Sequence, residues 1–271
     1  MTGITEAVSA RLHAAGAIAH AQDLYAGSGP DFYDRLVGSD RAEIREVLAL
    51  ARMTAGRVLD LAAGSGRLTI PLVRSGTSVT ALDLSEDMLM RLRNALPGDP
   101  RLECVVADIR DFSLGRPYDL IVLGATSITL LDRGGRSRLY ASVRRHLATG
   151  GVFAMSVASG ASAESLRTAT DREIAVPGPD GDEIYVFSQQ PDGEGTVRLV
   201  NWVRVADIAT GRGVRVLTSR LHVLDAETLA RELVDAGFTA PAVSPVRTQG
   251  GVDMVLLTTS AARVPTAERP R

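Results

Sequence analysis

The sequence predicts an α/β protein with a mostly parallel sheet, helices on both faces and an inserted antiparallel sheet. The first observation is a set of short, near-continuous apolar runs that alternate with helical patterns between residues 58 and 158. Strands of this kind are buried on both faces, which is typical of the parallel sheet in a doubly wound fold. The second observation is that this rhythm stops after Ser159, where stretches with a period of two residues begin.

Composition and charge exclude several classes of protein. The chain has 271 residues, a net charge of −2 and a single cysteine, Cys104. Such a chain has no general attraction to nucleic acid, and one cysteine excludes a disulfide framework and a cysteine-rich metal site. No two histidines have ligand spacing, so we expect no metal. Residues 1–22 fit neither a signal peptide nor a membrane span, so we expect a cytoplasmic protein without a membrane partner.

An N-terminal helical cap is predicted over residues 1–52. Residues 1–30 have Ala-rich helical spacing, and residues 31–37 begin a short helix or turn. A further helix over 40–51 has Asp40 as its capping residue. The core follows over 53–160, with strands at 58–61, 78–82, 102–106, 119–123 and 151–158 and helices at 68–74, 85–95 and 136–147.

Residues 161–224 are predicted to form the inserted antiparallel sheet, with three strands at 183–190, 196–208 and 213–224. Turn signals separate these stretches, and VRLVNWVRV alternates between polar and apolar residues, which indicates a sheet that is polar on one side. Residues 225–260 return to the core, with a helix capped by Asp225 and a last strand at 252–259. The tail over 261–271 is predicted to be disordered.

A glycine-containing turn follows the first core strand in VLDLAAGSGRLTI. Gly64 and Gly66 let the backbone approach a ligand closely, although a tight turn without a ligand has the same pattern. A dinucleotide fingerprint has a third glycine, but that position holds Thr69. In addition, Asp60 would repel a pyrophosphate and attract a cation.

Three acids, Asp60, Asp83 and Asp108, close three successive strands. Because the carboxyl ends of parallel strands meet at one edge of a sheet, we expect these acids to line one crevice. The second can accept hydrogen bonds from a ribose diol, and the third can accept one from an exocyclic amine such as adenine N6. A ligand with an amine, a ribose, an adenine and a positive centre, but no phosphate, is S-adenosylmethionine (SAM).

The stretches VLDLAAGSGRLTIPLV, ALDLSEDML, VVADIRDF and YDLIVLGATSI resemble, in order and spacing, the motifs of class I SAM-dependent methyltransferases. This resemblance covers residues 55–160 and implies a Rossmann-like fold with a seven-stranded sheet whose last strand is antiparallel. It implies that Asp60, Gly64 and Gly66 hold the methionine part of SAM. It also implies that Asp83 holds the ribose and Asp108 the adenine amine, and that S-adenosylhomocysteine (SAH) is the product. The other residues that it assigns to the cofactor are Ala62, Arg67, Leu84, Met88, Ile109, Gly124 and Ala125. Tyr33 is assigned to the cofactor by a second resemblance, to the upstream Tyr segment of small-molecule N,N-dimethyltransferases.

The flanking segments bear on the methyl acceptor. DFYDRLV resembles the upstream Tyr segment of small-molecule N,N-dimethyltransferases, including amino-sugar enzymes, and the insertion resembles the roof of their acceptor site. Leu130 stands where some of those enzymes have a histidine, which argues against an amino-sugar acceptor. FYDRLVGSDRAEIREVLALA and GATSITLLDR resemble methyltransferases of daptide-type ribosomal peptide pathways. That resemblance implies dimethylation of a primary amine on a modified peptide.

Candidate catalytic residues are Tyr33, Thr126 and Asp132, and candidate acceptor contacts are Tyr25, Ser127, Trp202, Arg204 and His222. For Tyr33 and Trp202 the alternative stays open that each is a packing residue without a direct role in the reaction. Arginines of the insertion such as Arg198 could steer an acidic peptide or sugar phosphate, or could simply be solvated. Rival functions are O- or N-methylation of a small molecule or sugar, NAD-dependent oxidation and SAM binding without turnover. A homodimer is also left open.

Overall fold

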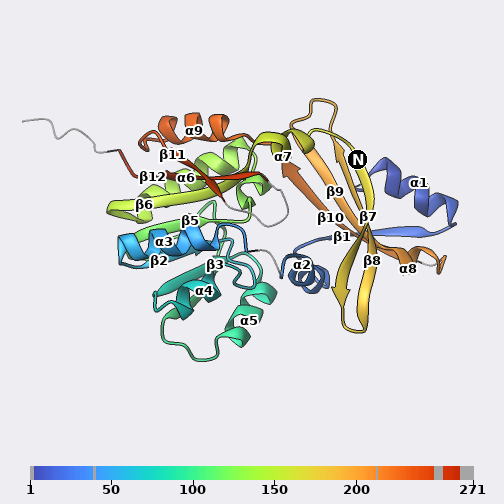
Figure 1. The fold of residues 1–271 in the computed structure, drawn as a ribbon, viewed down its shortest axis with the longest axis horizontal. Coiled ribbons are helices and arrows are strands. Elements are labelled where there is room, and N and C mark those ends of the chain that lie inside the picture. Colours follow the sequence, from blue (N-terminus) through green and yellow to red (C-terminus); the bar gives the residue numbers. More distant parts are fainter. Residues whose placement is uncertain (1–2, 39–40, 212, 247–252, 263–271) are drawn as a thin grey trace, which may run out of the picture.

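The computed structural model describes residues 3–38, 41–211, 213–246 and 253–262. Two sheets form two separate layers of structure, and helix α2 (Gly29–Val37) lies between them (Figure 1). The tail was predicted to be disordered over 261–271, but Ala261 forms an isolated β-bridge with Phe238, so that prediction is wrong at its first residue. Residues 263–271, the capping residue Asp40 and Val252, the predicted start of the last strand, lie outside the described residues.

The larger sheet has seven strands in the order β11-β12-β6-β5-β2-β3-β4. Strands β2 to β6 run parallel to one another, whereas β12 is antiparallel to both β6 and β11. The predicted Rossmann-like fold is therefore confirmed, including the antiparallel last strand. The strands are β2 Val58–Leu61, β3 Val79–Asp83, β4 Leu102–Val106, β5 Tyr118–Leu123, β6 Leu147–Ala158, β11 Ala242–Val246 and β12 Met254–Thr259.

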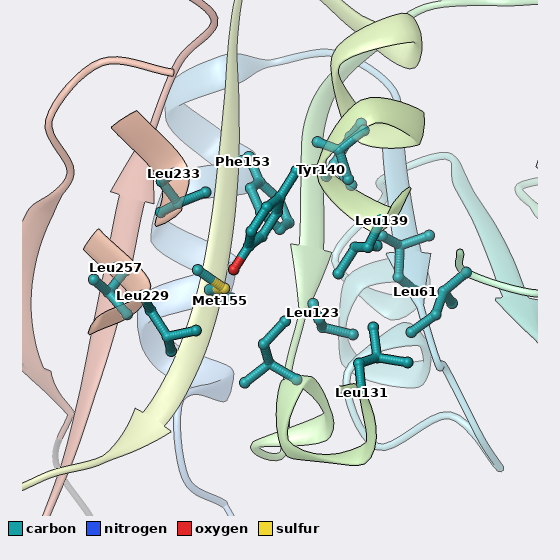
Figure 2. Packing of buried hydrophobic residues seen from close by; sticks show 14 of the residues in the cluster. Leu61, Leu123, Leu131, Leu139, Tyr140, Phe153, Met155, Leu229, Leu233 and Leu257 are labelled. Carbon is teal, nitrogen blue, oxygen red and sulfur yellow. The ribbon is translucent and has the colours of Figure 1, made fainter. Parts of the chain in front are cut away.

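Helices cover both faces of this sheet, because its central strands are apolar on both sides. Helices α6 and α9 cover one face, where Leu139 and Leu233 pack with Phe153 and Met155 of β6 (Figure 2). Helices α3, α4 and α5 cover the other face in a second apolar cluster. Their bounds are α3 Ile44–Thr54, α4 Thr69–Arg74, α5 Glu86–Ala95, α6 Arg133–His146 and α9 Ala226–Asp235. The short helices are η1 Ser127–Leu130, α7 Gly160–Ser165 and α8 Val205–Ile208.

The second sheet has five strands in the order β1-β10-β9-β8-β7, and we call it the lid sheet. Its strands are β1 Ile18–Asp23, β7 Thr170–Gly178, β8 Gly181–Pro191, β9 Val197–Arg204 and β10 Gly213–His222. The prediction of three strands in 161–224 is wrong, because β7 is a fourth. Its residues are mostly exposed, so it lacks the apolar alternation that revealed the others, and its turn into β8 is short.

The N-terminal cap is not wholly helical, so the prediction for residues 1–52 needs a correction. Helices α1 (Glu6–Ala14), α2 and α3 are present, but residues 18–23 form β1. Strand β1 pairs in parallel with β10, from Ile18 with Gly213 to Asp23 with Thr218. The Ala-rich stretch favours a helix locally, but pairing with the edge of the lid sheet determines its structure.

Helix α2 joins the lid sheet to the core. Its Phe32 ring packs against Tyr185 and Trp202, with centroids 4.5 and 5.2 Å apart. On the core side, Asp34 accepts a hydrogen bond from Ser65, which lies in the glycine turn after β2. The lid sheet is thereby held over the carboxyl ends of the core strands.

Candidate cofactor and acceptor site

A cavity of about 740 Å³ lies at the carboxyl ends of β2, β3 and β5, and near the end of β4. All the predicted cofactor residues line it except Gly66, and of the predicted acceptor and catalytic residues Tyr25, Thr126 and Ser127 do so as well. The lid sheet closes one side through Asp23, Tyr25 and Leu221. The sequence motifs therefore converge on one cavity.

The glycine turn shapes the floor of this cavity. Gly66 has φ +102°, and a Cβ atom there would lie 2.5 Å from Leu92 Cδ1 and 2.9 Å from Ile70 Cγ1. Gly66 therefore supports the turn from behind. The N–H of Gly64 donates to Asp83 Oδ2 at 2.8 Å. A pyrophosphate would need such an N–H group, so this turn is arranged differently from a dinucleotide site.

Asp60 is a carboxylate that burial has made hard to ionise. Its side chain is 2% exposed, and Thr69 Oγ1 donates to Asp60 Oδ2 at 2.6 Å. Burial raises the pKa of Asp60 to about 7, although the Thr69 hydrogen bond and the charge of Arg67 act in the opposite direction. Thr69, which breaks the dinucleotide fingerprint, thus orients an acid at the cavity. A cation bound beside Asp60 would favour its ionised form.

Asp83 is fixed by backbone donors. Besides the Gly64 N–H, the Ser85 N–H donates to Asp83 Oδ1 at 2.8 Å. Burial raises the pKa of Asp83, and these backbone hydrogen bonds oppose that effect. A carboxylate with one donor on each oxygen keeps free lone pairs, which is the arrangement that a ribose diol requires.

Asp108 has a basic partner that the sequence analysis did not consider. The Arg110 Nε lies 2.8 Å from Asp108 Oδ2, and this pairing holds the pKa of Asp108 below its usual value. Both side chains line the cavity. Asp108 therefore keeps its charge at neutral pH, while Arg110 competes for the oxygens that would accept from an adenine amine.

Glu43 is a site residue that the sequence analysis missed. Its carboxyl group is 0% exposed, forms an ion pair with Arg67 and accepts from the Ala125 N–H at 2.7 Å. Ala125 and Thr126 both have positive φ, at +54° and +57°. Gly124 precedes them because a Cβ atom there would lie 2.7 Å from Glu43 Oε1. Glu43 therefore fixes the loop after β5, whose Gly124 and Ala125 the resemblance assigns to the cofactor.

Glu43 carried no distinctive signal in the sequence. It was one acid within a helical pattern, and we predicted that the helix would begin earlier, behind Asp40. The structure begins α3 at Ile44, with Glu43 at the N-cap position and φ +55°. That left-handed conformation directs its carboxylate toward Arg67 rather than along the helix.

The acceptor side of the cavity is aromatic and hydroxylic. Tyr25 and Tyr33 pack edge to face with centroids 5.4 Å apart, and both line the cavity. Thr126 and Ser127 face it from the loop after β5. None of the described residues that line the cavity is a histidine.

Four of the predicted catalytic and acceptor residues lie outside the cavity lining, and three of them have other contacts in the structure. Asp132 is the N-cap of α6, with Oδ1 accepting from the Gly135 N–H at 2.6 Å. Trp202 is 7% exposed and packs the lid sheet onto α2, which was its alternative interpretation. Arg204 is paired with Glu183 at 2.7 Å. His222 follows Leu221, the last lining residue of β10, and alternation along a strand directs it to the other face.

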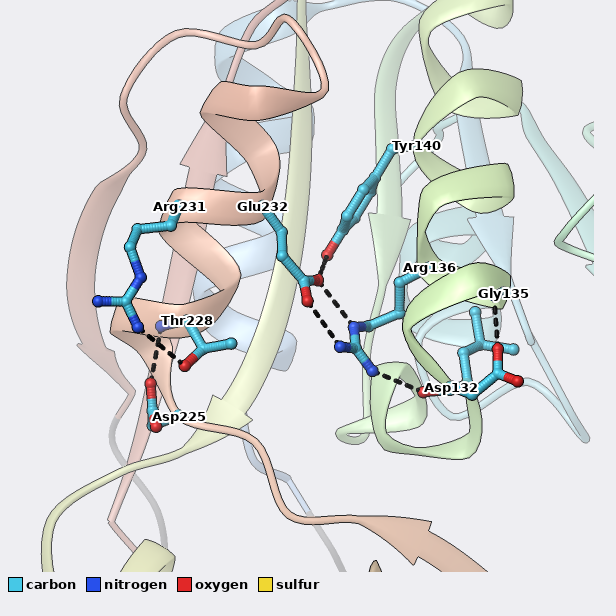
Figure 3. A network of polar contacts seen from close by, with 9 residues as sticks. Asp132, Gly135, Arg136, Tyr140, Asp225, Thr228, Arg231 and Glu232 are labelled. Atoms are coloured by element: carbon cyan, nitrogen blue, oxygen red, sulfur yellow. Dashed lines mark hydrogen bonds and ion pairs between the residues drawn. The ribbon is translucent and has the colours of Figure 1, made fainter. Parts of the chain in front are cut away.

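A buried polar network anchors the rim of the cavity (Figure 3). Arg136 of α6 pairs with Glu232 of α9 at 2.6 Å, and Tyr140 donates to the same carboxylate at 3.2 Å. Arg136 also donates to the Leu131 carbonyl at 2.9 Å. Because Leu131 lines the cavity directly after η1, this network fixes one wall of the site.

Fold and site together define a class of protein. Carboxylates at the ends of parallel strands face a cavity in which the nearest basic groups, Arg67 and Arg110, are already paired with acids. These residues fit a positively charged nucleoside without phosphate, since the buried Asp60 offers charge to a cation and Asp83 offers acceptors to a diol. Such a site on a doubly wound sheet is that of a SAM-binding protein.

Comparison with known proteins agrees with this class. Residues 58–151 match the family model described as a methyltransferase domain. The glycopeptide N-methyltransferase MtfA, in a crystal structure with SAH, is 32% identical, with 95% of this chain and 98% of that chain covered and a TM-score of 0.65. The chain therefore belongs to the class I SAM-dependent methyltransferases, and its cofactor is SAM.

Curated relatives match a shorter stretch. An amino-sugar N,N-dimethyltransferase from Streptomyces venezuelae, acting on dTDP-3-amino-3,4,6-trideoxy-alpha-D-glucopyranose, is 31% identical over 47% of this chain and 51% of its own length. A demethylmenaquinone methyltransferase from Clavibacter sepedonicus is 41% identical over 32% of this chain and 36% of its own length. The chain thus spans about half or less of the length of these two relatives.

Two features are absent from the residues that the structure describes. No helix in them is both long and apolar enough to cross a membrane. They also contain no group of three or more His, Cys, Asp or Glu side chains arranged to hold a metal ion.

Proposed function

We propose that this protein transfers methyl groups from SAM to the nitrogen of an amine in secondary metabolism. The similarity to MtfA, named a glycopeptide N-methyltransferase, extends over nearly the whole of both chains. Two curated relatives, from Streptomyces venezuelae and Saccharopolyspora spinosa, are named as amino-sugar N,N-dimethyltransferases. Nitrogen is therefore the acceptor atom in the named activities of several relatives.

The cavity's side chains carry the proposal. A hydroxyl acceptor needs a general base to remove its proton, and histidine is the usual one. The described lining offers hydroxyl groups from Tyr25, Thr126 and Ser127 in its place. A neutral amine is already a good nucleophile, so alignment and exclusion of water can supply most of the rate. The lining therefore favours nitrogen over oxygen.

Each residue then has a defined task. SAM supplies an electrophilic methyl group on a sulfonium centre. Asp60 and Asp83 attract and orient the cationic nucleoside, and Glu43 holds the loop at Ala125 against it. Tyr33 and Thr126 line the acceptor side, where their hydroxyls can orient the amine and take up its proton on the way to solvent.

We further propose that the amine belongs to a modified peptide and is methylated twice. The support is the resemblance of two sequence stretches to daptide-type methyltransferases, together with the glycopeptide activity named for MtfA. Leu130 lines the cavity at the place where some amino-sugar enzymes have a histidine, which favours a peptide over an amino sugar. An amino sugar is the second candidate, because two of the curated relatives are named for that activity.

A direct experiment measures transfer to matched acceptors. The purified chain is incubated with SAM and peptides that have one free amine, and with the same peptides after acetylation of that amine. Mass spectrometry should show gains of one and two methyl groups on the free amines and none on the acetylated forms. The Asp83→Ala variant is the matched control and should give less transfer than wild type when SAM is limiting. Methylation of hydroxyls in both forms would refute nitrogen as the acceptor, and no transfer to any amine would favour a protein that binds SAM without turnover.

A further inference from the structure

A cation without an acidic partner lies in the lid sheet. Arg198 of β9 is half-buried, and its Nη1 donates to Gln189, a neutral acceptor. Its Nε is buried and has no hydrogen-bond partner among the described residues. Arg204 of the same strand, by contrast, forms an ion pair with Glu183 at 2.7 Å. A half-buried guanidinium without a carboxylate costs stability, so its retention points to a ligand.

Strand register places Arg198 beside the cavity. Arg198 and Leu221 are directly opposite on β9 and β10, so their side chains project from the same face of the lid sheet. Leu221 lines the cavity and belongs to the apolar cluster that includes Tyr25 and Trp202. The guanidinium is therefore next to the roof of the acceptor side, on the face that is turned toward α2 and the core.

Tyr25 supplies a second donor at the same place. Its ring is fixed edge to face against Tyr33, and its hydroxyl has no hydrogen-bond partner among the described residues. Burial raises the pKa of the Tyr25 hydroxyl, and the positive charge of Arg198 acts against that effect. The two side chains are thus close enough to interact electrostatically, and each has donor capacity that the protein does not use.

We propose that Arg198 and Tyr25 form a subsite for a carboxylate on the methyl acceptor. This inference rests on the proposed function and adds the chemical class of the substrate, an amine that also carries a carboxylate. Nη1 is engaged by Gln189 and Nε is covered by protein atoms, so Nη2 is the donor of Arg198 that would bind the carboxylate. The Tyr25 hydroxyl would add a second hydrogen bond.

The local charge favours a monoanion over a phosphate. One guanidinium and one neutral hydroxyl compensate a single negative charge. Asp23 and Asp83 line the same cavity, and both act on the Tyr25 hydroxyl. Their negative charges would repel a dianionic or diphosphate group more strongly than a carboxylate. A nucleotide-linked sugar is therefore disfavoured at this subsite.

The first experiment needs no turnover. The SAH complex of the full chain is titrated calorimetrically with benzoate, benzamide and phenyl phosphate. We expect benzoate to bind and benzamide not to bind, and we expect Arg198→Met to weaken benzoate roughly ten- to hundredfold. Arg220→Met is the matched control, because Arg220 is exposed and adjacent to Leu221 on β10, so it projects from the opposite face. Tyr25→Phe should weaken benzoate less than Arg198→Met does.

Three outcomes would overturn the subsite. These are equal binding of benzoate and benzamide, unchanged benzoate binding by Arg198→Met, and tighter binding of phenyl phosphate than of benzoate. The melting temperature of Arg198→Met distinguishes a ligand-binding role of Arg198 from a structural one. Arg198→Met should melt at or above the wild-type temperature, because it removes an unpaired charge, and a clear loss of stability would show that Arg198 is structural.

The second experiment uses acceptors. Peptides with one free amine are compared as free acids and as amides. With wild type the acid should have the lower KM, and Arg198→Met should remove that preference by raising the KM of the acid. Arg220→Met should keep the wild-type preference and the wild-type kcat. Equal KM values for acid and amide with wild type would refute the subsite while leaving the proposed amine methylation intact. No transfer to either form would refute the proposed function, whereas the benzoate titration would still report on the subsite.

Discussion

Replacing Glu43 by glutamine should destabilise the protein and weaken SAH binding together. The carboxylate is fully buried and Arg67 is 14% exposed at its side chain, so the change removes the charge of Glu43 from its contact with a largely buried guanidinium. Breaking a buried pair by removing one partner costs about 3–5 kcal/mol, and the partial exposure of Arg67 argues for the lower end. For a chain of this size, about 3 kcal/mol corresponds to a fall in Tm of roughly 6–12 °C.

The measurement is thermal unfolding by calorimetry, with and without SAH, alongside an SAH titration. Glu103→Gln is the matched control, since Glu103 pairs with Arg116 at the surface, where both side chains are more than two-fifths exposed. Surface pairs contribute about 0–1 kcal/mol, so this control should change Tm little. Because Glu43 also accepts from the Ala125 N–H, we expect SAH to bind roughly tenfold more weakly to Glu43→Gln. A Tm and an SAH affinity equal to those of Glu103→Gln would refute the assigned role.

Three further predictions concern the cofactor side. Asp83→Ala should reduce SAH affinity at least roughly tenfold in a titration, with circular dichroism unchanged, because two hydrogen bonds to a ribose diol are lost; unchanged affinity would show that the ribose lies elsewhere. Asp60 has a folded pKa of about 7, against about 4 in an unfolded chain, so the folded state binds the extra proton between these values. The free energy of unfolding without ligand should therefore fall as pH rises through this window, and SAM should bind more tightly above pH 7. Asp60→Asn should remove the pH dependence of stability and the pH dependence of SAM binding. Gly66→Ala should lower stability by about 1–3 kcal/mol in denaturant unfolding, because φ is +102° and Leu92 lies behind it; an unchanged midpoint would contradict this role.

The sequence predicted the core because its signals are local. Apolar runs mark β2, β3 and β5 as strands buried on both faces, and their order places Asp60 and Asp83 at one edge. Capping residues were also predictable, since Asp225 accepts from the Thr228 N–H at 2.7 Å, as its position before α9 indicated. In these cases the residue type and its spacing were sufficient to predict the strand or the helix cap.

The lid sheet was less predictable because its structure depends on partners far away in the chain. Strand β1 is Ala-rich and becomes a strand through pairing with β10. Alternation in β9 showed that Trp202 lies on one face but not which element covers that face, and the structure shows α2 there. The roles of Glu43 and Arg198 depend on which side chains lie next to them in the folded chain. Residue spacing does not encode those neighbours.

The parallel pairing of β1 with β10 has a consequence for synthesis of the chain. Ile18 leaves the ribosome long before Gly213, its partner, so the lid sheet cannot be completed until most of the chain has been made. During this interval the backbone donors and acceptors of β1 have no strand to pair with, and they are open to the same segment of another nascent copy. Translation speed and chaperone access over residues 160–213 should therefore influence the yield of active enzyme more than the stability of the finished protein does.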